Sequence, residues 1–194
     1  MNVDPAVRLA DGSDSRVPPR CGKARRKTLI ALAAVFVVAC AATARLFIWP
    51  TQGMPSRVDA IVMLDSPGHP LAFAVRLAGQ HRAPFLVVSQ GTPASRDPCP
   101  RRVPGVTLIC FNPMPPTTRG EAEFVGHLAE KYHWRSIAVV AITPQATRGR
   151  LRVERCFPGR VYMVTASIRP GIWPYQIGYE WAAFIKALVI ERSC

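Results

Sequence analysis

Short apolar runs alternate with amphipathic stretches along residues 58–192. A nearly uninterrupted apolar run is typical of a strand buried on both faces of a parallel sheet, whereas apolar residues three or four positions apart indicate a helix with one buried side. The apolar runs predict strands at 58–64, 85–88, 106–111, 137–141 and 161–164. The amphipathic stretches predict helices at 70–80, 118–132, 147–156 and 176–192.

This alternation of strands and helices predicts an α/β fold. We expect a Rossmann-like three-layer sandwich, with a mainly parallel five-stranded sheet covered by helices on both faces. In such sheets, ligands bind outside the carboxyl ends of the strands. A binding site is therefore expected among the loops that follow the strands, at 65–70, 89–93, 112–119, 142–148 and 165–174.

A separate apolar segment precedes the α/β pattern. Residues 28–44 carry no charge, and the apolar run continues past Arg45 to Trp49. This is close to the ~20 residues that a membrane-spanning helix needs. Basic side chains crowd residues 20–27 just before the run, so the positive-inside rule places the N-terminus in the cytoplasm.

The predicted organisation is a single-pass protein of the cell membrane with an extracytoplasmic C-terminal domain. Its parts are a basic tail (1–27), a transmembrane signal anchor (28–49), a linker (50–57) and an exported domain (58–194). Three alternatives stay open for the apolar segment. They are a cleaved signal peptide with the small-x-small site 42–44, a lipoprotein signal that ends at Cys40, and a buried helix of a soluble protein.

The net charge of +13 comes from 25 Lys and Arg against 12 Asp and Glu. Residues 1–27 hold seven basic and three acidic side chains, a net +4 that serves as a topology signal. The remaining positive charge is scattered and no nucleic-acid motif accompanies it, so nucleic acid is not an expected partner. An anionic membrane surface or envelope polymer is compatible with it.

Four of the six cysteines fall in the expected exported domain. We favour the pairs Cys99–Cys110 and Cys156–Cys194, because the first two flank one Pro/Arg-rich loop and the others end a helix and the chain. Four free, buried thiols are the alternative, since a domain of this size folds without disulfides. No Cys-x-x-Cys pair or His/Cys cluster occurs, so no metal site is expected.

Several segments, taken in order, resemble the YdcF/SanA/ElyC-like family of bacterial envelope proteins. They are the strand 58–64, the strand end 87–91, Thr117-Thr118-Arg119-Gly120-Glu121-Ala122, and Arg148 at the end of 139–148. Cys156-Phe157, Glu180-Trp181 and Lys186-Ala187-Leu188 resemble the actinobacterial branch. The resemblance implies a membrane-anchored α/β domain that takes part in envelope-polymer or lipid-carrier metabolism. One member of the family is thought to bind S-adenosylmethionine, but the residues here indicate no particular cofactor.

This chain departs from the family pattern at two loops. Asp65-Ser66 stands where the family has a Gly-Gly turn, and Ala141 and Gln145 stand where it has Thr and His. A glutamine hydrogen-bonds but does not exchange protons near neutral pH, so a general acid or base at position 145 is lost.

The candidate ligand-binding residues all lie in the loops after the strands. The set is Asp65, Ser66, Ser89, Gln90, Gly91, Thr118, Arg119, Gln145 and Arg148. Arg119 and Arg148 are expected to hold an anionic group, because a guanidinium binds phosphate or carboxylate through two hydrogen bonds. A solvated or Glu-paired Arg119 is the alternative. Ser89 is expected to be a polar crevice residue and not a nucleophile, because no nucleophile elbow surrounds it.

Weak candidates for proton transfer are Asp65, His69 and Glu121. Glu121 has a structural alternative, because Thr118 as N-cap with Glu121 three residues later forms a capping-box pattern. Two functions follow. One is an envelope enzyme or binding protein for an anionic, lipid-linked or nucleotide-like ligand, and the other is a catalytically degenerate envelope-maintenance protein or scaffold. No oligomeric state follows from the sequence.

Overall fold

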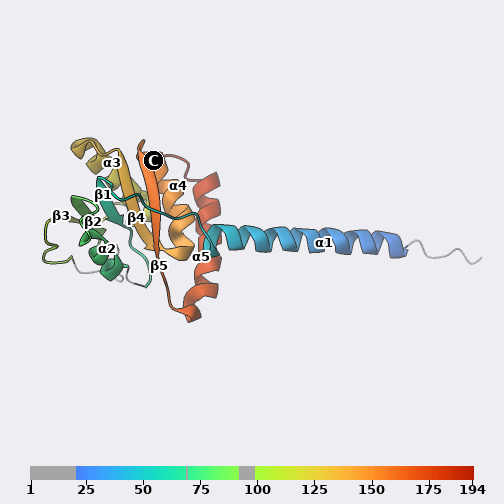
Figure 1. Cartoon of the computed structure of the whole chain (residues 1–194). Helices are drawn as coiled ribbons and strands as arrows, with labels where there is room; N and C mark the ends of the chain where they lie inside the picture. Colours follow the sequence, from blue (N-terminus) through green and yellow to red (C-terminus); the bar gives the residue numbers. More distant parts are fainter. Residues whose placement is uncertain (1–20, 69, 92–98) are drawn as a thin grey trace, which may run out of the picture. The chain divides into compact units, whose positions relative to one another are not determined.

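The computed structural model describes residues 21–68, 70–91 and 99–194. Residues from Cys40 onward form one compact unit, and Figure 1 shows its α/β architecture. The strands are β1 (Ala60–Met63), β2 (Phe85–Ser89), β3 (Thr107–Phe111), β4 (Ser136–Ile142) and β5 (Arg160–Ala166). The α-helices are α1 (Cys21–Thr43), α2 (Leu71–Ala78), α3 (Thr118–Tyr132), α4 (Ala146–Cys156) and α5 (Trp173–Val189). Short turns lie at η1 (Ala44–Ile48), η2 (Thr143–Gln145) and η3 (Pro170–Ile172).

The five strands form one sheet in the order β3-β2-β1-β4-β5, and every neighbouring pair is parallel. This confirms the predicted Rossmann-like α/β class. The strands are apolar throughout because both faces of the sheet are covered. Alternate residues of β1 point to opposite layers: Ile61 and Met63 pack with α2, whereas Ala60 and Val62 pack with α3 and α4.

Helix α5 was predicted at 176–192 but lies three residues earlier, at Trp173–Val189. A 3₁₀ turn at η3 leads into it, and Pro174 occupies its first turn, where a missing N–H costs nothing. The first two turns of this helix matter for function, because Tyr175, Gln176, Tyr179 and Glu180 line a cavity.

The end of the long apolar helix belongs to the compact unit. Phe47 of η1 is fully buried and packs edge-on against Trp181 and Phe184 of α5, at centroid distances of 5.2 and 6.2 Å. Trp181 Nε1 donates a hydrogen bond to Thr43 Oγ1 at 3.0 Å. The following segment 50–57 also lies on the domain, since Gly53 N donates to the Met163 carbonyl and Arg82 donates to the Pro55 carbonyl.

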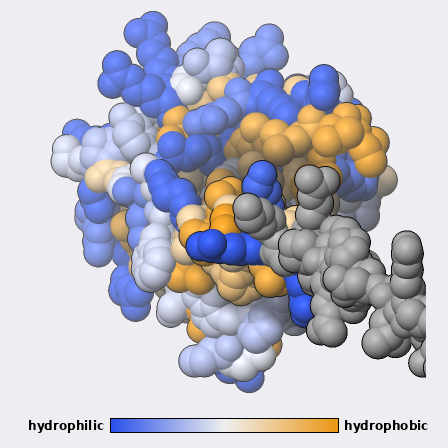
Figure 2. Space-filling model, turned by 90° about the vertical axis from the view of Figure 1, so that its right-hand side faces the viewer, coloured by the Kyte–Doolittle hydropathy of each residue, from blue (hydrophilic) through white to orange (hydrophobic). Residues whose placement is uncertain are grey.

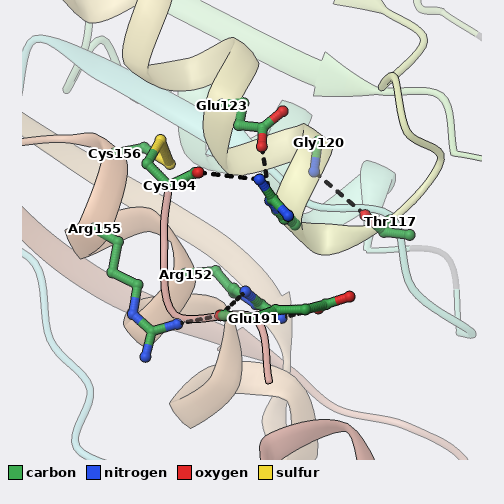
Figure 3. The surroundings of a disulfide bond; sticks show 9 residues. Thr117, Gly120, Glu123, Arg152, Arg155, Cys156, Glu191 and Cys194 are labelled. Carbon is green, nitrogen blue, oxygen red and sulfur yellow. Dashed lines mark hydrogen bonds and ion pairs between the residues drawn. A yellow bond between two sulfur atoms is a disulfide. The ribbon is translucent and has the colours of Figure 1, made fainter. Parts of the chain in front are cut away.

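Both predicted disulfides are present. Cys99 is bonded to Cys110, and Cys156 at the end of α4 is bonded to Cys194. Around the second bond, Arg119 and Arg155 donate to backbone carbonyls of the C-terminal segment, and Arg152 pairs with Glu191 (Figure 3). Charged and covalent contacts thus hold residues 190–194 against α3 and α4.

Candidate functional site

The sheet order places a topological switch point between β1 and β4. The chain leaves β1 toward β2 on one side and leaves β4 toward β5 on the other, so a crevice opens between the two loops at their carboxyl ends. A cavity of about 170 Å³ lies there. It is lined by Asp65, Pro67, Pro116, Thr117, Thr118, Gln145, Arg148, Tyr175, Gln176, Tyr179 and Glu180. Pockets for drug-sized ligands measure roughly 300–1,000 Å³, so this cavity holds a single small group and not a whole nucleotide.

Arg148 lies in this cavity but its charge is already neutralised. Its Nε and Nη2 donate to the two carboxylate oxygens of Glu180 at 2.6 and 2.8 Å, and its Nη1 donates to Thr118 Oγ1 at 2.8 Å. Burial opposes the charge of Arg148, but the hydrogen bonds and charge of Glu180 outweigh burial and raise its pKa. The predicted anion-holding role of Arg148 therefore lacks a free guanidinium edge.

Glu180 is a site residue that the sequence reading missed. It is fully buried on α5, and Gln176 one turn earlier donates to its Oε1 at 3.2 Å. A carboxylate and an amide at i and i+4 in an otherwise apolar helix were the available signal, because a charged residue is rarely buried without a partner. The partner itself, Arg148, is 32 residues away in the chain.

Glu121 is buried under the loop that follows β1. Its Oε1 accepts a hydrogen bond from the Asp65 N–H at 2.7 Å. Burial raises the pKa of Glu121 to about 7, and the charge of Asp65 adds to the rise, whereas the Ser89 hydroxyl, the Asp65 N–H and Arg148 oppose it. A carboxyl that titrates near neutral pH can give or take a proton under physiological conditions.

The predicted capping box is wrong. The N-cap of α3 is Thr117, whose side chain accepts from the Gly120 N–H at 3.3 Å. Thr118 is the first helical residue and its hydroxyl faces Arg148. With the cap one residue earlier, Glu121 falls past the capping position and turns to the β1 loop, so it has a role beyond helix initiation.

Gln145 joins the two loops of the switch point. Its Nε2 donates to the Asp65 carbonyl at 3.2 Å, and this bond fixes the amide orientation, because the reverse orientation would bring two oxygens together. Gln145 is only 3% exposed, and within the described part of the chain its Oε1 has no hydrogen-bond partner. A buried acceptor without a partner is costly, so a donor group that reached this atom would be bound favourably.

Four further predicted residues surround the cavity without lining it. Ser89 and Ser66 are buried at the ends of β2 and β1, and Gln90 is half-buried beside them. Gly91 has a positive φ of 62°, and a Cβ there would overlap the carboxylate of Asp65. Glycine at position 91 thus lets the Asp65 side chain pack against the end of β2.

The predicted two-arginine pocket is not formed. Arg119 donates to Glu123 at 2.8 Å and to the Cys194 carbonyl at 3.2 Å, and it does not line the cavity (Figure 3). It is the Glu-paired arginine of the alternative reading. His69 lies outside the described residues, so its expected role in proton transfer stays a prediction.

The cavity carries more negative than positive charge. Arg148 is paired with Glu180, Asp65 is a second acidic residue of the lining, and Glu121 lies buried behind the Asp65 amide. An anion would enter against this field, whereas a neutral group that offers hydrogen-bond donors would not. In the part of the chain that the structure describes, no group of three or more His, Cys, Asp or Glu could hold a metal ion.

Comparisons with known proteins add little. No family model and no curated protein matches the chain. Among solved structures, pantothenate synthetase from Thermus thermophilus is similar at 18% identity and a TM-score of 0.31, over 58% of this chain and 57% of that one. A resemblance at this level carries no argument about the site.

Proposed function

We propose that the chain is a membrane-anchored protein of the bacterial envelope, as its resemblance to the YdcF/SanA/ElyC-like proteins implies. Its α/β domain binds a neutral, hydroxyl- or amide-bearing group of a lipid-linked envelope precursor in the cavity between β1 and β4. The single observation that carries the binding role is the buried, unsatisfied Oε1 of Gln145, a residue that lines a cavity whose one guanidinium, among the described residues, is already paired.

The anchor role is supported by one helix, Ala24–Ile48, which is long and apolar enough to cross a membrane. Its most apolar stretch is not buried inside the protein, unlike the core helix of a soluble domain. Cleavage after Ala44 would also separate Thr43 from Trp181, to which it is hydrogen-bonded. An uncleaved anchor keeps this contact, so it is favoured over the cleaved signal peptide.

The ligand class follows from size and charge. The cavity of about 170 Å³ admits a group the size of one sugar ring, and Gln145, Thr117 and Asp65 offer polar partners to it. Tyr175 and Tyr179 lie at the same cavity and are exposed, so they present apolar ring surface to a ligand. A free phosphate would meet no unpaired arginine among the residues that line this cavity.

An enzyme is the second candidate, and Glu121 favours it. A buried carboxyl with a pKa of about 7 is a typical general acid or base. Glu121 lies behind the Asp65 amide and does not line the cavity, so proton exchange with a ligand would pass through Asp65 or Ser89. Binding is therefore the better supported role.

N-acetylglucosamine is a suitable probe, because it offers hydroxyl and amide donors without charge. We expect saturation-transfer NMR on the full chain in lipid nanodiscs to show binding, and Gln145→Leu to weaken it about tenfold by removal of a cavity acceptor. Gln80→Leu, on the exposed surface, is the matched control and should bind normally. Equal loss in both variants, or binding that Gln145→Leu leaves unchanged, would count against the proposal.

A further inference from the structure

The outward face of α5 carries apolar side chains that nothing in the described structure covers. Ile185 and Val189 are 52 and 62% exposed, and Ile190, directly after the helix, is 74% exposed. Gly178 and Ala182 lie on the same side of the helix, opposite the fully buried Glu180. Figure 2, seen from the right-hand side of Figure 1, shows apolar residues (orange) gathered in patches between hydrophilic ones (blue). An exposed apolar stripe on a helix marks a contact with another apolar phase.

The neighbour of this helix within the compact unit is the end of the candidate membrane span. That span finishes at Ile48, and its last turn packs on the middle of α5 through Phe47, Trp181 and Phe184. Thr43 Oγ1, one turn earlier, accepts from Trp181 Nε1. If residues 24–48 cross the bilayer, the middle of α5 lies where the chain leaves it.

Charged and aromatic residues near this junction fit the lipid headgroup region. Trp49 is 71% exposed directly after the span, and the guanidinium of Arg45 is held by the Trp49 carbonyl and Thr51. Lys186 and Arg192 are exposed at the end of α5. Tryptophan concentrates at membrane interfaces because its ring is amphipathic. Basic side chains concentrate there because they meet anionic lipids.

We propose that the outward face of α5 is a membrane-contact surface that lies in the bilayer interface beside the anchor. The inference rests on the proposed anchor role and extends it. Gln176 and Glu180, on the inward side of the same helix, line the cavity, with Tyr175 and Tyr179 at its edge. Contact along α5 therefore brings the cavity close to the lipid surface, so its ligand would arrive as the head of a membrane-resident molecule and not from bulk solvent.

A second copy of this chain is the rival occupant, because Gly178 and Ala182 would let another helix approach closely. The two occupants predict different cross-links. A photoreactive benzoylphenylalanine at Val189 in the full chain, reconstituted in phosphatidylcholine/phosphatidylglycerol vesicles, reacts with whatever covers the helix. The same group at Glu130, exposed on α3, is the matched control, and at Val37 in α1 it tests the span itself.

We expect lipid adducts at Val189 to exceed those at Glu130 at least about fivefold. Chain-to-chain adducts at Val189 would overturn the proposal in favour of a dimer, and adduct levels equal to those at Glu130 would overturn it in favour of a solvent-exposed helix. Lipid adducts at Val37 but not at Val189 reject only this inference. Absence of lipid adducts at Val37 rejects the anchor as well, so the two failures are distinguishable.

Discussion

Removal of one partner of the buried pair Arg148–Glu180 should strongly destabilise the domain. Glu180→Gln keeps the volume of the side chain but leaves the guanidinium of Arg148, which is 7% exposed, without its counter-charge. Removal of one partner of a buried ion pair costs about 3–5 kcal/mol. For a unit of this size that loss lowers the melting temperature by roughly 6–20 °C.

The matched control is the pair Arg119–Glu123, whose side chains are 36 and 27% exposed. Pairs of this kind contribute about 0–1 kcal/mol, so Glu123→Gln should lower the free energy of unfolding by no more than that. Urea unfolding of the full chain in detergent, followed by tryptophan fluorescence, measures both variants.

The double variant Arg148→Met/Glu180→Leu separates buried charge from lost packing. Because it removes both charges, it should be less destabilised than Glu180→Gln, although Thr118 and Gln176 lose a partner. The reasoning would be refuted if Glu180→Gln cost as little as Glu123→Gln, or if the double variant were less stable than Glu180→Gln.

Three further predictions concern other parts of the domain. Glu121 has a pKa raised from 4.5 in the unfolded chain to about 7 in the folded one, so its protonation stabilises the fold by about 3 kcal/mol below pH 4.5. This stabilisation is lost as the pH rises through 7. The urea midpoint of the wild type should therefore fall over this pH range, and that of Glu121→Gln should not show this fall. Cys194→Ser opens a loop with a sequence separation of 38 and should lower the free energy of unfolding by up to about 4 kcal/mol. Cys99→Ser opens a loop with a separation of 11 and should lower it by about 3 kcal/mol. Equal denaturant midpoints for wild type and both variants would contradict this. Gly91→Ala should lower the free energy of unfolding by at least about 1 kcal/mol and weaken binding of N-acetylglucosamine, because Gly91 has a positive φ and a Cβ there would overlap Asp65. Gly171→Ala, whose Cβ would meet open space, is the control and should do neither in the same assays.

The sheet, the helices on its faces and the disulfide pairs could be predicted because their signals are local. Apolar runs define β1 to β5, and Cys99 and Cys110 flank one loop. Helix boundaries depend on caps, and the sequence does not distinguish the adjacent Thr117 and Thr118 as N-cap. In the structure Thr117 caps the helix, and the Thr118 hydroxyl accepts from Arg148, 30 residues away. That single-residue difference changed the role of Glu121.

The site itself was predicted only in part. Asp65, Gln145 and Arg148 meet at one cavity because the strand order brings the ends of β1 and β4 together, and Thr118 joins them from α3, which packs on α4. What could not be predicted was the state of the charges. Arg148 and Arg119 are equivalent in sequence terms, but Glu180 neutralises one and Glu123 holds the other outside the cavity.

The most direct test of the account compares two ligands that differ by one phosphate group. Dissociation constants of N-acetylglucosamine and N-acetylglucosamine 6-phosphate should be measured on the full chain in nanodiscs. The account predicts that the neutral sugar binds at least about tenfold more tightly, because Glu180 already pairs with Arg148, the one arginine among the residues that line the cavity. Tighter binding of the phosphorylated sugar would contradict it and would return Arg148 to the role of an anion-binding residue.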